Sequence, residues 1–593
     1  MGLIIGSFSD GWQNKARPEL MKDSAVFMCR DCSMDELGSL TCRQKHSEET
    51  FFSTQTNTSE IESYCQLDIE GVDHKLIYYV VGSTLYRWNS FTGASTAIST
   101  AVTKSHVSYA PLKPVLSDTT FVFITDGVTM LCDNGTSTKT WGIDPPENLP
   151  LVSMAGSGGS LSAGDYSYRY TFYDHNTGSE SDPSVASATT TAAADDEATL
   201  TNIEVSSDSR VTRRRIYRTL VGGGSWYLVA SLNDNVTTTY TDATADANLT
   251  TKLTTDQGIP QTGDIIVSYK DRLFMSGDSN YPNRVYFSMS EKPDNWPSTN
   301  YLDVGTSDDS VENVVEFEGK LYFMQRATIS GLYGSDADTF AYHKTRSHVG
   351  VWARWSVASG PDGIYFLGHD GVYRFDGLKS VRISEAIDRT FGQIADTWTE
   401  VVDSDTVKSV ARGVFLEGVY YLLLPMKNVD GTVTNRILSY NAFQQTWLAY
   451  DINCSTLFSD QGRGKLYGGL EKPDDSGKYS VYELMSATTG TDTASPQATT
   501  KSFNIVPQRE DGQSRAVGWL RKFRVDCKGS WTLTFYVDGT SEHSQALTDQ
   551  SASTRYAWYD FGPNTKGRYL QVHIEATGSP LPETYVFNEL EVV

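Results

Sequence analysis

Four side chains near the amino terminus have the residue types of a zinc site. Cys29, Cys32, Cys42 and His46 are separated by two, nine and three residues. Thiolates and imidazoles at short spacings hold tetrahedral zinc in many small domains. Free cysteines also serve as small apolar side chains in a core, and no knuckle glycine stands beside the first pair. We therefore predict no metal site and no cofactor, with these four residues as the zinc candidate to test.

Carboxylates are abundant, but their spacing selects no catalytic pair. The chain has 73 Asp and Glu residues, so pairs that imitate a glycosidase dyad arise by chance. Nucleophile-elbow, zinc-protease, phosphate-loop and dinucleotide-binding motifs are absent from the sequence. The acidic pairs Asp308, Asp309 and Asp336, Asp338 lack the ligand ladder of a calcium loop. The sequence thus predicts a protein that is not an enzyme.

The charge balance argues against a protein that grips nucleic acid. Formal net charge is −24, from 49 basic and 73 acidic residues, whereas phosphate-binding surfaces carry the opposite sign. Such acidity favours solubility, and it repels DNA from any surface that faces it. Both interpretations stay open at this point, because acidic surfaces are common in soluble proteins.

The seven cysteines and the apolar pattern indicate where the protein is made. An odd cysteine count, without a basic and apolar leader, predicts reduced thiols in a cytoplasmic environment. No apolar run approaches the ~20 residues that cross a bilayer, so stable membrane insertion is not expected.

Short strands and tight turns must position these residues. A chain of 593 residues exceeds one hydrophobic core, and its 33 Tyr and 48 Gly favour strands and turns over helices. Strand, two-residue turn, strand occurs over 75–88 and 119–132, and similar hairpins recur after residue 257. Their spacing of about 50 residues is typical of propeller blades. In the interval between, Tyr166, Tyr168, Tyr170 and Phe172 alternate as in a half-buried strand.

The predicted fold class is therefore all-β: a β-propeller with an inserted fibronectin- or immunoglobulin-like β-sandwich and a C-terminal β-sandwich. The predicted segments are 1–147 for the N-terminal segment and first blades, 148–248 for the inserted sandwich, 249–497 for the remaining blades and 498–593 for the C-terminal sandwich.

Several stretches, taken in order, resemble one family. The opening stretches are 17–32 and 37–44, the blade stretches 271–277, 281–290, 293–296, 350–357 and 370–377, and the module stretches 215–219 and 240–242. The opening stretches are similar to those of the tail nozzle and tail tubular proteins of short-tailed bacteriophages, and the blade stretches resemble the blade motifs of the same family. The module stretches resemble fibronectin-like modules of phage structural proteins.

The resemblance implies a structural component of the virion tail, made in the host cytoplasm. It implies a ring of identical subunits, six in this family, below the portal and the adaptor or head-to-tail connector protein, with tail fibres or spikes as neighbours. Genomic DNA would be retained by this channel and ejected through it without sequence-specific binding. Carboxylates such as Asp308, Asp309, Asp336 and Asp338 are candidates for an acidic channel lining.

Other interpretations remain open. A receptor- or carbohydrate-binding virion protein would suit the 12 Trp and 33 Tyr, although most of them lie in strand alternations that core packing explains. A polysaccharide depolymerase is disfavoured by the missing motifs. The stretch 41–44 departs from the basic run and Pro-Gly of the family, so nozzle, stopper and tube remain alternatives.

Overall fold

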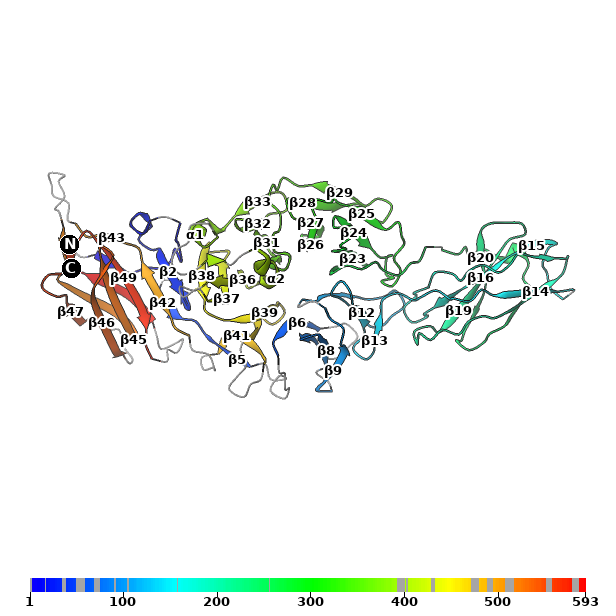
Figure 1. The fold of residues 1–593 in the computed structure, drawn as a ribbon, viewed down its shortest axis with the longest axis horizontal. Coiled ribbons are helices and arrows are strands. Elements are labelled where there is room, and N and C mark those ends of the chain that lie inside the picture. The colour runs from blue at the N-terminus through cyan, green and yellow to red at the C-terminus, as the bar shows by residue number, and fades with distance from the viewer. Residues whose placement is uncertain are drawn as a thin grey trace.

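The computed structural model describes residues 3–593 apart from 16, 35–38, 49–58, 69–74, 90–91, 104–105, 157, 255, 392–399, 402–403, 428–431, 471–478, 488–493, 507–516, 551–556 and 579–585. The molecule is a row of three β-rich parts, with a propeller in the middle, an inserted sandwich at one end and a C-terminal sandwich at the other (Figure 1). The predicted fold class is confirmed.

Seven four-stranded blades form the propeller in the described part of the chain. Six are separate sheets, and the other belongs to a larger sheet that continues into the C-terminal sandwich. The first three blades comprise β6 (Ile61–Asp68), β7 (Lys75–Val81), β8 (Thr84–Asn89), β9 (Ala94–Ser99); β10 (Ser108–Leu112), β11 (Phe121–Thr125), β12 (Met130–Asp133), β13 (Thr138–Thr140); and β22 (Ile265–Tyr269), β23 (Arg272–Ser276), β24 (Arg284–Phe287), β25 (Tyr301–Asp303).

The next four blades complete the ring. They comprise β26 (Val311–Phe317), β27 (Lys320–Gln325), β28 (Ile329–Tyr333), β29 (Ala341–Lys344); β30 (Ala358–Gly360), β31 (Gly363–Gly368), β32 (Gly371–Phe375), β33 (Ser380–Arg382); β35 (Arg412–Leu416), β36 (Val419–Lys427), β37 (Val433–Asn441), β38 (Thr446–Tyr450); and β39 (Cys454–Asp460), β40 (Lys465–Leu470), β41 (Val481–Ala487), β5 (Lys45–Glu48). Contacts between the innermost strands β39 and β6 close the circle.

Two-residue turns explain why these hairpins form. At Glu318–Gly319 and Glu417–Gly418 both residues have positive φ, between 47° and 83°. Positive φ at both central positions is the type I′ conformation, whose twist matches the twist of the flanking strands. The Glu-Gly dipeptides seen in the sequence therefore mark the tips of blade hairpins.

The last blade takes its outer strand from the other end of the chain. Strand β5 pairs antiparallel with β41, so a segment near residue 45 closes the ring at residue 487. The predicted N-terminal segment 1–147 thus divides. Residues 45–48 complete the last blade, those from 61 onward form the first two blades, and the strands before β5 belong elsewhere.

Those first strands belong to the C-terminal sandwich. They are β1 (Leu3–Ile5), β2 (Val26–Arg30), β3 (Cys32–Met34) and β4 (Leu40–Cys42). β1 and β4 pair with β50 (Val586–Val592), and β2 pairs with β42 (Gln497–Thr500). The longest strand of the sandwich, β45 (Lys522–Val537), pairs with β46 (Thr540–Gln550), β47 (Ala557–Asp560), β49 (Tyr569–Ala576) and β50.

One hydrophobic core joins this sandwich to the propeller. Phe8, Trp12 and Trp531 of the sandwich belong to the same buried cluster as Tyr365 and Tyr420 of the propeller. A fully buried ion pair reinforces the junction, because Arg43 binds Asp31 at 2.7 Å with both side chains 2% exposed. The same carboxylate accepts hydrogen bonds from the backbone N–H groups of residues 451 and 495.

The inserted sandwich has a core of its own. Its strands are β14 (Leu151–Ala155), β15 (Gly164–Tyr166), β16 (Tyr168–Tyr173), β17 (Thr190–Ala192), β18 (Glu197–Thr201), β19 (Arg213–Thr219), β20 (Trp226–Leu232) and β21 (Tyr240–Asp242). The alternating aromatics Tyr166, Tyr168, Tyr170 and Phe172 are all buried in it, as the period-two pattern predicts. Two buried arginines accompany them. Arg218 pairs with the equally buried Asp242 at 2.6 Å, and Arg214 with the more exposed Asp234 at 2.8 Å.

Candidate functional site

Strand direction gives the propeller two chemically different faces. In each antiparallel blade, the turn between the second and third strands lies at the same end as the connection to the next blade. We call this end the connector face and the opposite end the hairpin face. Asp309, which precedes β26, accepts hydrogen bonds at 2.7 Å from the Ala327 backbone and the Thr328 hydroxyl in the β27–β28 turn. The contact confirms that both segments lie on the connector face.

A basic pocket lies on the connector face. Its volume is about 290 Å³, and Glu312, Arg326, Trp352, Arg354 and Lys408 line it. The guanidinium of Arg354 binds Glu312 at 3.0 Å and Asp264, just before β22, at 2.6 Å. One cation therefore ties together the inner ends of three blades, and both of these carboxylates are engaged in ion pairs.

Aromatic rings meet across the propeller axis beside this pocket. Trp355, in the short 3-10 helix η4 (Arg354–Ser356), contacts His106 with 3.9 Å between the ring centroids. His106 precedes the second blade and Trp355 precedes the fifth of seven, so the contact spans the axis. Burial, and then the charge of Arg412, lower the pKa of His106 well below 6.5 and keep the ring neutral. Side chains thus fill the axis at this level.

Arg412 is a buried cation whose charge acts on His106. It is buried at the start of β35, and its Nη1 donates hydrogen bonds to two backbone carbonyls, those of Ser409 at 2.7 Å and Ala411 at 3.1 Å. Burial lowers its pKa to about 10, so the guanidinium still carries its charge at neutral pH. Burial raises the pKa of Glu62, and the positive charge of Arg412 opposes part of that rise. A buried positive charge therefore lies at the start of β35, close enough to affect His106.

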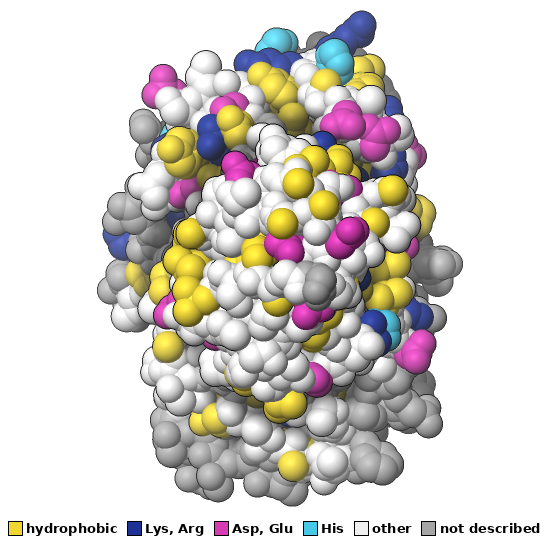
Figure 2. Space-filling model, turned by 90° about the vertical axis from the view of Figure 1, so that its right-hand side faces the viewer, with side chains coloured by type: hydrophobic (Ala, Val, Ile, Leu, Met, Phe, Trp, Pro, Cys, Tyr) yellow, Lys and Arg dark blue, Asp and Glu magenta, His cyan; other side chains and the backbone are white. Residues whose placement is uncertain are grey.

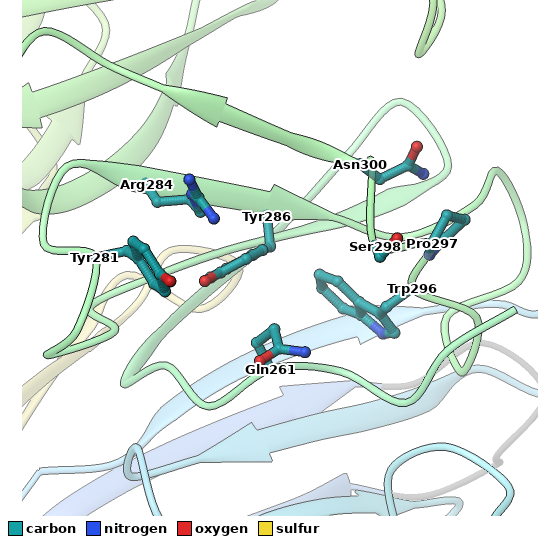
Figure 3. Close-up of a pocket in the computed structure, with 8 residues that line it drawn as sticks. All are labelled: Gln261, Tyr281, Arg284, Tyr286, Trp296, Pro297, Ser298 and Asn300. Atoms are coloured by element: carbon teal, nitrogen blue, oxygen red, sulfur yellow. The ribbon is translucent and has the colours of Figure 1, made fainter. Parts of the chain in front are cut away.

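A second pocket lies on the rim of the third blade, where Gln261, in the segment that follows the inserted sandwich, contributes to its lining (Figure 3). Its volume is about 210 Å³. The rings of Tyr281, Tyr286 and Trp296 and the amide of Gln261 surround the open space in Figure 3. Arg284 lies over the rings of Tyr281 and Tyr301, with its guanidinium carbon 4.2 and 3.7 Å from their centroids.

Carboxylates behind the wall of this rim pocket hold its side chains in place. Asp303 accepts hydrogen bonds from Nε and Nη2 of Arg284 at 2.7 and 3.0 Å. Asp278 accepts one from the hydroxyl of Tyr286 at 2.8 Å. Asp256 accepts from the backbone and the hydroxyl of Ser298, which also lines the pocket. The wall is therefore preorganised, and these three acids are occupied.

Polar contacts next to the rim pocket fix the inserted sandwich to the third blade. Asp294 accepts hydrogen bonds from Ser179 of the sandwich at 3.0 Å and from the backbone N–H of Gly142 at 3.1 Å. Arg210 of the sandwich donates to the same carboxylate and to the Gly142 carbonyl. Asn295 donates to the carbonyl of Glu180 at 2.6 Å. A continuous network therefore sets the direction of the sandwich.

The free end of the inserted sandwich carries few basic groups. Figure 2 looks along the molecule onto that end and shows mostly uncharged side chains, with scattered acidic and hydrophobic ones, while Lys and Arg lie towards the edge of the view. The structure explains part of this, because Arg214 and Arg218 are both 0% exposed. The run Arg213–Arg215 therefore offers no continuous basic surface, and its middle residue lies in the core.

The zinc candidates lie in two different environments. Cys29 and Cys32 are buried free thiols in the core shared by propeller and C-terminal sandwich, and Cys42, also buried and free, lies opposite Cys32 in the β3–β4 pair. His46 lies on β5 and contacts the ring of Tyr482. Burial raises the pKa of Cys42 to about 12, so this thiol is protonated at neutral pH in the metal-free chain. Within the residues that the structure describes, no group of three His, Cys, Asp or Glu is arranged to hold a metal ion.

The four candidate lining carboxylates occur on opposite faces. Asp308 and Asp309 precede β26 on the connector face, and Asp308 is exposed. Asp336 and Asp338 are exposed in the β28–β29 turn, which lies on the hairpin face between the two outer strands of the blade. The structure of one chain does not bring the two pairs together.

Comparisons with known proteins identify structures but no sequence family. No protein-family model and no curated protein matches the chain. Solved structures that match include an exo-β-1,3-galactanase from Phanerochaete chrysosporium, with 11% identity over 56% of this chain and 95% of that one and a TM-score of 0.20. A family 43 arabinoxylan arabinofuranohydrolase from Bacillus subtilis matches with 10% identity over 90% and 94%, TM-score 0.17. BBS1N, solved in complex with ARL6DN, matches with 6% identity over 76% and 99%, TM-score 0.25.

These matches correct one prediction from the sequence. Several of the matching structures are glycoside hydrolases, so the prediction that the chain is not an enzyme is wrong as an inference from missing motifs. At TM-scores of 0.17–0.25 the matches assign no reaction or substrate to this chain. Within its described residues, no helix is long and apolar enough to cross a membrane.

Proposed function

We propose that the chain is a structural component of a bacteriophage tail, one subunit of a nozzle or tail-tube ring that retains the genome and conducts it during ejection. In the virion it would contact the adaptor or head-to-tail connector above and tail fibres or spikes beside it. DNA would pass without sequence-specific binding. The ring would be a homo-oligomer, with six copies implied by the resemblance described above.

The observation that carries the proposal is where the family-like motifs fall. The stretch 293–296 supplies Asp294 and Asn295, which fix the inserted sandwich to the third blade. The stretch 350–357 supplies Arg354 and Trp355, which fill the propeller axis. The stretches 215–219 and 240–242 supply the buried ion pair of Arg218. The resemblance therefore lies in residues that join the inserted sandwich to the propeller, that join neighbouring blades, and that hold the core of the inserted sandwich together, as expected for an assembly component.

The filled axis supports a channel that is formed between copies and not within one propeller. DNA cannot share the axis with Trp355, His106 and the Arg354 ion pairs. Several chains would have to surround the DNA, and cyclic symmetry closes such a ring from identical contacts. The net charge of −24 would then serve the channel by keeping phosphates hydrated and mobile.

Electron microscopy of the purified protein and of the particle tests the proposal. We expect closed rings on the tail axis, and particles that lack this subunit should lose their DNA. Particles that retain DNA and fail only at adsorption would favour the receptor- or carbohydrate-binding alternative instead.

Charge reversal tests the channel lining. If the connector face borders the channel, the double variant Asp308→Lys, Asp309→Lys should slow ejection. The effect should be stronger at low salt, because charges act on each other over only about 10 Å at ~0.1 M salt and over longer distances when the salt concentration is lower. Asp336→Lys with Asp338→Lys is the matched control on the hairpin face. An equal effect of both double variants at all salt concentrations would contradict an electrostatic role of the lining.

A further inference from the structure

We propose that the rim pocket of the third blade is a binding site for one ring of an uncharged sugar. The inference is independent of the tail function, because it depends on the side chains of Figure 3 and not on assembly. It also differs from a site on the propeller axis, where enclosed charges and rings fill the space.

The size of the pocket limits the ligand to a small ring. Its volume of about 210 Å³ lies below the roughly 300–1,000 Å³ typical of sites for drug-sized ligands. The pocket opens at the surface beside Tyr281, whose side chain is 48% exposed. A single terminal sugar can therefore enter while the rest of a glycan remains in solvent.

The aromatic side chains offer the surface that a sugar ring needs. Tyr281, Tyr286 and Trp296 border the space. The apolar C–H face of a sugar packs on such rings, while their polar ends form hydrogen bonds. Trp296 cannot rotate freely, because its Nε1 donates to the Pro293 carbonyl at 2.7 Å and its ring stacks on Trp141. The platform is thus rigid before the ligand arrives.

The pocket lining also offers the hydroxyl groups of a sugar a set of hydrogen-bond donors and acceptors. Among the residues that the structure describes, the hydroxyl of Tyr281 and the side-chain amides of Gln261 and Asn300 form no hydrogen bond. A hydroxyl and two amides can each donate and accept, which matches the dual character of sugar hydroxyls. The neighbouring lining groups are already held by Asp303, Asp278 and Asp256.

Charge at the pocket disfavours an anionic ligand. Arg284 is the cation of the lining, and Asp303 occupies its Nε and Nη2. Two tyrosine rings lie against the guanidinium. A phosphate or a sugar acid would have to compete with this carboxylate, whereas a neutral sugar needs only a hydrogen bond from the remaining nitrogen.

Saturation-transfer NMR on the whole protein tests the site with methyl β-D-galactoside and methyl α-D-glucoside as probes, and with glucuronate and adenosine as comparisons. We expect saturation transfer to at least one neutral glycoside. Tyr281→Ala should weaken its binding about fivefold to tenfold, the loss of one aromatic contact. Gln261→Ala, at an exposed position, tests the hydrogen bonds without disturbing the core.

Tyr333→Ala is the matched control, because Tyr333 is also a 48% exposed tyrosine and lies on the next blade, outside the pocket. It should bind the glycoside like the unmodified protein. Three outcomes would overturn the proposal: no transfer to either glycoside at millimolar concentration, equal loss in Tyr281→Ala and Tyr333→Ala, or preference for adenosine or glucuronate. None of them bears on ring formation, so this proposal and the tail proposal can fail separately.

Discussion

The two sandwiches of this chain share an architecture but are held in opposite ways. The inserted sandwich is continuous in sequence, and its core contains, apart from Ile143, only its own side chains. Its junction with the propeller is polar, through Asp294, Arg210 and Asn295. The C-terminal sandwich draws strands from both ends of the chain and shares one hydrophobic core with the propeller. We infer that the first is a separable module and the second is part of one cooperative unit.

Their interiors also differ in chemistry. The C-terminal core is rich in phenylalanine, with Phe523, Phe535 and Phe561 in mutual contact. In the inserted sandwich tyrosines dominate, and the hydroxyl of Tyr168 binds Asp242 at 2.9 Å next to Arg218. Polar groups in a core are stable only while each has its partner. The inserted module is therefore sensitive to single polar substitutions, whereas the shared core is sensitive to lost volume.

Deletion should show the largest difference between the two sandwiches. Replacing residues 148–252 with a short Gly-Ser linker should leave a soluble chain that unfolds cooperatively, because the hydrophobic cores of the propeller stay intact. Removing residues 1–44 should abolish folding, since it exposes the shared core beneath Phe8 and Trp12. Circular dichroism and limited proteolysis measure both. Aggregation of the first variant with normal folding of the second would reverse our assignment.

Removal of a single buried carboxylate from the inserted sandwich should have the next largest effect on stability. Asp242→Ala leaves the buried Arg218 without its nearest partner, and breaking a buried pair costs about 3–5 kcal/mol. Calorimetry should show the transition of the inserted sandwich lowered and that of the remaining chain unchanged. Asp234→Ala is the matched control, because its partner Arg214 is equally buried while Asp234 itself is 42% exposed, so the loss should be much smaller. A shift of both transitions by Asp242→Ala would mean that the modules unfold together.

The junction itself should give the smallest effect on stability and the clearest effect on shape. Asp294→Ala removes the acceptor shared by Ser179, Arg210 and Gly142. Because these donors are left without a partner, the free energy of unfolding should fall by about 1–3 kcal/mol. Small-angle scattering should then show a broader range of orientations of the inserted sandwich. An unchanged scattering profile would show that the remaining contacts, including Asn295, suffice to hold it.

Local patterns in the sequence predicted the elements well. The alternation from Tyr166 to Phe172 gave a buried strand face, and the hairpin over 75–88 became β7 and β8. Partners far apart in the chain left no such signal. Pairing of β1 with β50 depends on register across more than 580 residues, and nothing near Leu3 encodes it. For the same reason the first 44 residues were placed with the first blades.

The sites were harder to predict for a related reason. Tyr281 and Trp296 stand in stretches that the sequence singled out, but Gln261 joins them only because the chain returns from the inserted sandwich past the third blade. Three consecutive basic residues, Arg213–Arg215, would ordinarily lie on an exposed strand. Arg214 is buried instead, because the carbonyls of Glu204 and Thr237 and the carboxylate of Asp234 converge on it. A convergence of backbone carbonyls has no sequence motif.

Closure of the ring by β5 has a consequence for synthesis. Strand β5 must wait for β41, and β1 and β4 must wait for β50, so these strands leave the ribosome several hundred residues before their partners. At about 5–20 residues per second, these intervals of roughly 430 to 590 residues correspond to about 20 seconds to two minutes of translation. During that time the inserted sandwich can fold alone, while the leading strands keep open hydrogen-bonding edges. The propeller and the C-terminal sandwich can therefore close only after β41 and β50 have been made, which separates their folding in time from that of the inserted sandwich.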